Sequence, residues 1–193
     1  MRQCRQIGLL LCFAGFLSVR AQSPLLSVER RDNYLHVAAP QLHFLEGKSL
    51  DQLQNGASVA YVFELTLTSD QKIIARSQQR FILSFDLWEE KFSVVQAGAH
   101  GRSRSHLTAP MAEAWCLDSL QIPIPALSPE RSFVIKLDCR ATMNVDESNE
   151  DSSPGLSLAG LIDALSRKGR DAPPRWQAFS NPLRFADLAG NKK

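Results

Sequence analysis

The sequence predicts a mainly β protein, an antiparallel two-layer β-sandwich with two short α-helices. Three observations lead to this fold class. Apolar and polar residues alternate over several segments, which is the side-chain period of a strand. Only two segments show sustained helical spacing of apolar residues. Beyond an N-terminal export-like segment about 170 residues remain, enough for one domain with a real core.

The N-terminus has the three-part layout of a secretory signal peptide over residues 1–21. Arg2 and Arg5 form a basic start, an apolar run of about 13 residues follows, and Val19-Arg20-Ala21 places small residues at a cleavage site. A membrane-spanning helix needs roughly 20 apolar residues, so we prefer a cleaved signal to a retained anchor. Cleavage after Ala21 changes the formal net charge from +2 to −1, with 19 basic and 20 acidic residues left. A chain this close to neutrality lacks the basic footprint of a nucleic-acid binder.

Four segments of the remaining chain, predicted as one domain over residues 22–193, carry the strand pattern. Residues 25–39 predict two short strands joined at Asp32-Asn33, residue types that tolerate turn backbone. Residues 57–70 predict a strand with one fully buried face, and residues 132–144 a strand with one wet face. Residues 72–96 predict a hairpin that reverses at 88–91, with Trp88 covering its apolar face.

The remaining segments predict helices, a loop and a tail. Residues 48–56 predict a single helical turn with Ser49 as N-cap, and residues 108–120 a helix with Pro110 in its first turn. Residues 156–167 predict an amphipathic helix that either packs on a sheet or binds a membrane or partner. The acidic stretch near 146–155 predicts a flexible loop. The tail from 171 predicts irregular chain or one last edge strand.

Cys116 and Cys139 are the two cysteines left after signal cleavage. An even pair in an oxidising compartment permits a disulfide, whereas two buried thiols would pack as small hydrophobes. Spacing alone does not place their Cα atoms within bridging distance, so both alternatives stay open.

The clearest candidate for ligand binding is the glycine-rich stretch 98–106. Arg102, Arg104, His100 and His106 could contact an anion through their side chains and exposed backbone N–H groups. A solvated hairpin loop has the same composition, and we favour that interpretation.

The sequence contains no convincing metal, cofactor or catalytic motif. The four histidines lack helical i, i+4 spacing, and the acidic loop lacks the ordered spacing of a calcium loop. Glu89 and Glu90 are adjacent at a hairpin tip and would point apart, so we do not expect an acid/base pair. No nucleophile elbow and no phosphate-binding loop is present. We therefore expect no cofactor, no bound metal and no enzymatic activity.

The segment from Gly56 to Val94 resembles the family of small exported bacterial envelope proteins catalogued as domain of unknown function 4390. The family pattern Y-x-L-x-Y-x-x-L-x-x-x-Y-x-V is followed in residue type by Phe81, Leu83, Phe85, Trp88, Phe92 and Val94. The resemblance spans roughly residues 33–188, mostly as hydrophobic spacing. The acidic loop and the two cysteines depart from it. It implies an exported envelope protein and assigns no catalytic residue or ligand.

These observations predict an exported, non-enzymatic envelope protein, periplasmic or extracellular, that acts as an interaction or adaptor module. The alternative is a binder of a lipid or small apolar ligand between two β layers, which would need an apolar cavity of several hundred Å³. The expected partner is an envelope protein or a lipid and not a nucleic acid. The sequence predicts no transmembrane segment in the mature chain.

Overall fold

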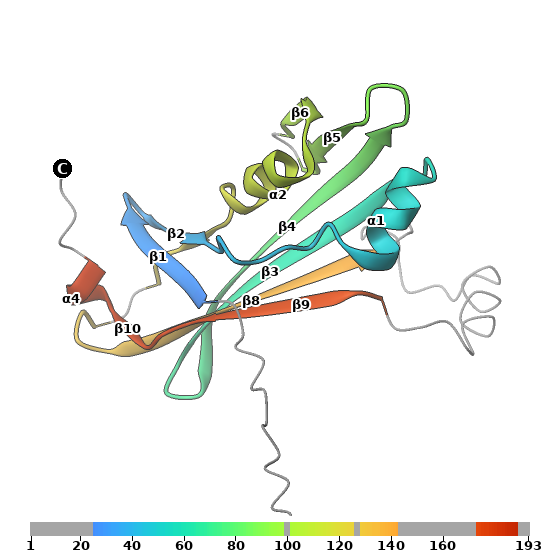
Figure 1. The fold of residues 1–193 in the computed structure, drawn as a ribbon. Helices are drawn as coiled ribbons and strands as arrows, with labels where there is room; N and C mark the ends of the chain where they lie inside the picture. Colours follow the sequence, from blue (N-terminus) through green and yellow to red (C-terminus); the bar gives the residue numbers. More distant parts are fainter. Residues whose placement is uncertain (1–24, 99–100, 126–127, 143–172, 189–193) are drawn as a thin grey trace, which may run out of the picture.

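The computed structural model describes residues 25–98, 101–125, 128–142 and 173–188, and its main body is a sheet of long strands (Figure 1). The strands are β1 (Leu25–Arg31), β2 (Tyr34–Ala38), β3 (Val59–Ser69), β4 (Lys72–Asp86), β5 (Lys91–Gln96), β6 (Ser103–Leu107), β7 (Gln121–Pro123), β8 (Ser132–Thr142), β9 (Arg175–Ser180) and β10 (Leu183–Arg184). The helices are α1 (Gly47–Gln54), α2 (Ala109–Leu117) and α4 (Phe185–Leu188).

All ten strands join one sheet in the order β6-β5-β4-β3-β8-β9-β1-β2-β7, with β10 paired to β8. Neighbouring strands are antiparallel except β1 and β9, which pair in parallel. Figure 1 shows β3, β4, β8 and β9 running side by side, with α1, α2, β1 and β2 on the same side of these strands. The prediction of a mainly β fold is confirmed. The arrangement is compatible with two layers, although its strands belong to one mixed sheet.

Strand β3 carries the centre of the core because its odd-numbered side chains all face inward. Val59, Tyr61, Phe63, Leu65 and Leu67 are each at most 1% exposed, whereas the even-numbered residues from Val62 onward are half-buried. The neighbouring strands continue this layer, since Phe81 of β4 and Ala141 of β8 stand opposite Tyr61. The period-two pattern of the sequence thus fixes which face of the sheet is buried.

Helix α2 and the extended chain before α1 cover this buried face. Phe44 packs against Phe63 with ring centroids 5.1 Å apart, and Trp115 of α2 packs against Phe81 at 5.8 Å. Edge-to-face ring contacts of this kind add stability beyond the apolar area that they bury. The layer is therefore filled with side chains across β3 and β4.

Helix α1 begins earlier than the sequence predicts. Its N-cap is Glu46, and Ser49 lies inside the helix, where its hydroxyl donates a 3.0 Å hydrogen bond to the Glu46 carbonyl. The predicted stop is present, because Gly56 adopts φ +83, a left-handed conformation that favours glycine. Helix α2 has Thr108 as its N-cap, has Pro110 in its first turn as predicted, and ends at Leu117.

The tail differs from its prediction. Residues 175–180 form β9, which lies inside the sheet between β8 and β1 and is not an edge strand. The predicted strands at 57–70 and 132–144, and the hairpin at 72–96, are confirmed as β3, β8 and β4–β5.

Three predictions fall outside the described residues: the signal peptide at 1–21, the acidic loop near 146–155 and the helix at 156–167. Within the described ranges, none of the helices has both the length and the apolar character needed to cross a membrane.

Candidate interaction site

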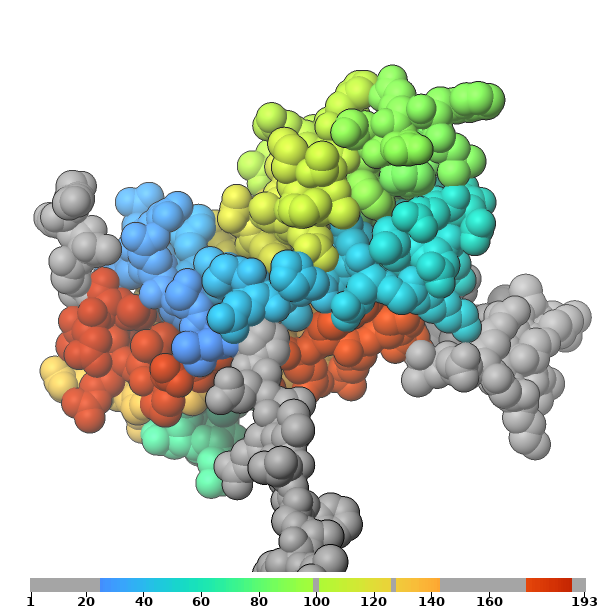
Figure 2. Space-filling view, in the orientation of Figure 1, coloured from blue at the N-terminus to red at the C-terminus, as the bar shows by residue number. Residues whose placement is uncertain are grey.

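The β4–β5 turn, residues Leu87–Glu90, exposes the most solvent-accessible large apolar side chain among the described residues. Trp88 is 97% exposed and Leu87 is 57% exposed. Figure 1 shows this turn at the far end of the long β3–β4 strands, and in Figure 2 the same green segment projects from the body of the molecule. We call residues Leu87–Glu90 the Trp88 turn.

The sequence at the turn explains how the chain reverses here. Strand pairing ends at Asp86, which stands opposite Lys91. The Asp86 carboxylate accepts hydrogen bonds from the backbone N–H groups of Trp88 at 2.8 Å and Glu89 at 3.0 Å. Aspartate often closes turns in this way, by satisfying the N–H groups of the residues that follow. These two hydrogen bonds hold the pKa of Asp86 below its usual value, and the bond from the Glu89 N–H has the larger effect.

A contact from the neighbouring strand holds the other half of the turn. His106 of β6 lies 3.0 Å from the Glu89 carboxylate, measured from Nε2 to Oε2, and its Nδ1 lies 3.0 Å from the Ser105 hydroxyl. Glu90 adopts φ +54 and His106 adopts φ +60, so both use the left-handed region that most residues avoid. Leu87 passes close to the end of α1, 3.9 Å from where a β-carbon of Gly56 would lie. The turn is therefore linked to β6 through His106 and lies close to the chain that follows α1.

The exposure of Trp88 corrects the expectation from the sequence. Helix α2 covers part of the hairpin's apolar face, where Trp115 meets Phe81 edge-to-face, and Phe85 contacts Phe92 across the hairpin with ring centroids 4.8 Å apart. Trp88 is 97% exposed and covers none of this surface. Strand β4 ends at Asp86, so its period-two pattern stops there and Leu87 is 57% exposed.

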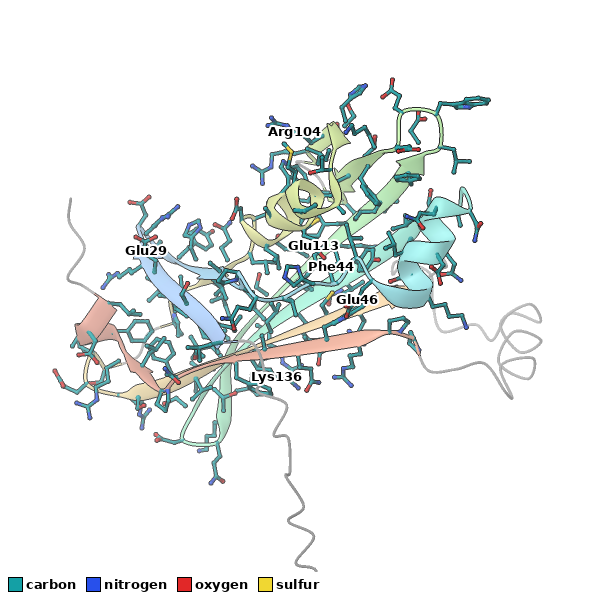
Figure 3. All side chains as sticks on the ribbon, viewed as in Figure 1. Glu29, Phe44, Glu46, Arg104, Glu113 and Lys136 are labelled. Atoms are coloured by element: carbon teal, nitrogen blue, oxygen red, sulfur yellow. The ribbon has the colours of Figure 1, made fainter. Side chains whose placement is uncertain are left out.

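A second polar cluster joins α2 to the chain before α1. The Glu113 carboxylate accepts hydrogen bonds from the backbone N–H groups of Phe44 at 2.7 Å and Leu45 at 2.8 Å, and its other oxygen lies 3.0 Å from His43 Nδ1. Figure 3 shows Glu113 and Phe44 beside each other between α2 and the chain that leads to α1. The hydrogen bond to Glu113 raises the pKa of His43. Glu113 thus uses both carboxylate oxygens to join α2 to residues 43–45. We call these contacts the Glu113 latch.

A third cluster lies on the opposite face of the sheet, around Asp138 of β8. This carboxylate is 6% exposed and accepts bidentate hydrogen bonds from Arg175 and a 2.8 Å bond from Gln177, both on β9. Burial acts to raise the pKa of Asp138, but the Arg175 and Gln177 hydrogen bonds outweigh it and hold that pKa below its usual value. The cluster therefore pairs the side chains of adjacent strands.

A shallow, open cleft of about 420 Å³ lies between the start of α1 and the start of β9. Its lining includes Glu46, Arg175 and Trp176. Glu46 already accepts a 2.9 Å hydrogen bond from the Trp176 indole, and Arg175 is held by Asp138. Glu46 and Trp176 are thus paired with each other and Arg175 is paired with Asp138, and the mixed lining is not the predominantly apolar one that a lipid tail requires.

Three residues of the predicted anion loop, Arg102, Arg104 and His106, lie in the described chain, and each has different surroundings. Arg102 donates to Gln96 at 3.3 Å and to Ser119 at 3.1 Å and lies 5.7 Å above the Trp115 ring. His106 faces Glu89, and Arg104 lies exposed on β6 opposite Val94 (Figure 3). His100 is outside the described residues. Much of the predicted loop belongs to strand β6. The sequence pattern does not predict this strand, because its residues are mostly polar.

Cys116 of α2 and Cys139 of β8 are both fully buried free thiols. Burial raises the pKa of each thiol, and each sits on the core-facing side of its element. In the structure the two cysteines are therefore buried free thiols that pack as small hydrophobes. The disulfide stays a prediction.

Glu89 and Glu90 do not form a carboxylate pair, because Glu89 is directed to His106. Within the described ranges, no cluster of three or more His, Cys, Asp or Glu side chains is placed to hold a metal ion.

Comparison of the chain with family models, with curated proteins and with solved structures finds no match. The resemblance to the envelope family stays a prediction.

Proposed function

We propose that this chain is an exported, non-enzymatic bacterial envelope protein that acts as an interaction module and docks through the Trp88 turn. The observation that carries the proposal is the 97% exposed Trp88 on a braced turn. The apolar area of a fully exposed tryptophan is still available for burial against a partner, and tryptophan is among the residues most enriched in binding hot spots. The export-like N-terminus and the family resemblance support the location in the envelope.

The packing of the described core supports docking over ligand binding between layers. The side chains on the inner face of β3 are at most 1% exposed, and the cleft beside α1 is lined by charged groups. An apolar ligand would need an enclosed apolar cavity. Mass spectrometry of the natively purified chain tests the alternative, and a stoichiometric co-purified lipid would favour it.

The experiment that tests the proposal has two parts. N-terminal sequencing of the chain recovered from the envelope of an expressing bacterium should show cleavage after Ala21. Cross-linked neighbours of the mature chain should then be captured by the wild type and lost with Trp88→Ser. Met111→Ser is the matched control, because Met111 is 51% exposed on α2. An uncleaved, cytoplasmic chain, or equal capture by wild type and Trp88→Ser, would contradict the proposal.

A further inference from the structure

We propose that the Trp88 turn docks into an apolar pocket of a protein partner whose rim carries Lys or Arg side chains. This inference rests on the proposed function and names the class of partner. It comes from three properties of the turn: an apolar anchor, a fixed backbone and a surrounding negative charge.

The apolar anchor is Trp88 together with Leu87. They are 97% and 57% exposed and adjacent in sequence, so one shallow pocket could receive both. Pockets that receive such anchors exclude water around them, which is typical of the centre of a protein interface. Two residues form a compact anchor, and this suits a pocket better than a broad flat surface.

The fixed backbone lowers the entropic cost of docking. Asp86 holds the N–H groups of Trp88 and Glu89, and His106 holds the Glu89 side chain at 3.0 Å. A loop that is already ordered loses less conformational freedom on binding. The structure therefore presents Trp88 in a conformation suited to insertion.

The negative charge determines the class of partner. Asp86, Glu89 and Glu90 place three carboxylates in or directly beside the turn, against the ammonium of Lys91 and the imidazole of His106 that contacts Glu89. Segments that insert into anionic bilayers carry Lys and Arg beside their apolar residues, because the lipid headgroups repel carboxylates. A pocket rimmed by Lys or Arg complements the carboxylates, which steers association and fixes orientation.

The experiment replaces Leu87, one half of the anchor, by an apolar photocross-linker and leaves Trp88 in place. The full chain carrying Leu87→p-benzoylphenylalanine is expressed in the bacterium that encodes it, irradiated, and its adducts are quantified. We expect a discrete protein adduct that falls on the order of 30-fold with Trp88→Ser, the loss typical of a hot-spot residue. It should also fall severalfold with Glu89→Gln plus Glu90→Gln, and with added salt, because salt screens exposed charges.

A matched variant separates charge from rigidity. His106→Asn removes the contact to Glu89 but keeps all three carboxylates, and asparagine tolerates the φ of +60 at this position. A smaller loss with His106→Asn than with the double glutamine variant supports the charge argument. An equal loss overturns it, since rigidity would then explain both results.

The other outcomes are also decisive. An adduct that needs Trp88 but ignores Glu89→Gln plus Glu90→Gln overturns this inference and leaves the proposed function standing. No adduct, or an adduct indifferent to Trp88→Ser, overturns both. A phospholipid adduct, an adduct with a second copy of the chain, or flotation of the purified chain with phosphatidylcholine:phosphatidylglycerol vesicles overturns the assigned partner class.

Discussion

Glu113 is a buried carboxylate whose position explains how the chain before α1 is held to α2. Its oxygens accept the backbone N–H groups of Phe44 and Leu45 and contact His43. A buried carboxylate is costly unless such donors replace water. No sequence motif predicts this role, because the donors are backbone groups about 70 residues away.

Removing the Glu113 carboxylate should destabilise the protein. Glu113→Ala leaves two buried N–H groups without an acceptor, and each unsatisfied group costs about 1–3 kcal/mol. We expect a loss of about 2–5 kcal/mol in the free energy of unfolding, measured by urea denaturation. Glu130→Ala is the control, because Glu130 is exposed and should change stability little. Equal stability of the two variants would contradict the latch.

The His43–Glu113 contact should make stability depend on pH. The hydrogen bond to Glu113 raises the folded pKa of His43 above its usual value, so the folded state favours the charged ring. Its contribution is complete below the unfolded pKa and is lost as pH rises through the folded pKa. Unfolding free energies from pH 5 to 9 should therefore fall above about 6.5, with a shallower fall in His43→Gln. A rise over that interval that depends on His43 would refute this assignment.

At the scale of single elements, the local sequence pattern predicted most of the strands. It did not predict the edge strand β6 or the side-chain contacts between strands. Period two located β3, β8 and the β4–β5 hairpin, because each alternates apolar and polar residues along its length. Strand β6 was missed because its residues Ser103 to His106 are exposed at a sheet edge and carry no apolar face. Asp138 was placed on a wet face, but Arg175 and Gln177 of β9 cover it.

Asp138 should link β8 to β9 in a way that acid disrupts. Its folded pKa is lowered, with burial opposing and the Arg175 and Gln177 hydrogen bonds prevailing, so its stabilising contribution is present above the unfolded pKa. That contribution is lost as pH falls through the folded pKa. Asp138→Asn should cost about 1–3 kcal/mol at pH 7 and remove part of the acid dependence, measured by urea denaturation from pH 2 to 7. An acid profile identical to wild type would contradict it.

The Trp88 turn should loosen when its aspartate is removed. Asp86→Ala deprives the Trp88 and Glu89 N–H groups of their acceptor. Amide hydrogen exchange at these two residues should accelerate, while the amides of β3 keep their protection. Asp118→Ala is a matched control, because it removes an aspartate at the end of α2 instead of at the turn. Unchanged exchange at Trp88 and Glu89 would show that the turn is held without Asp86.

At the scale of the whole molecule, the order of the strands could not be predicted from local pattern. The tail was predicted as irregular chain or an edge strand, yet the backbone of β9 pairs with β8 on one side and with β1 on the other. The local sequence of residues 175–180 does not predict that β1 pairs with them. Such long-range pairing depends on which apolar faces fit together, and this is a property of the assembled core.

The interior position of β9 predicts that the C-terminal segment is needed for folding. A chain ending at residue 172 would leave the facing edges of β8 and β1 unpaired and would uncover Cys139, which stands opposite Trp176. Unpaired buried backbone groups and lost apolar contacts each cost several kcal/mol, comparable with the whole stability of a domain. We expect no cooperative thermal transition by circular dichroism for this truncation. A chain ending at residue 188 keeps β9 and should unfold like the full chain, whereas a cooperative transition in the shorter chain would mean that β9 is peripheral.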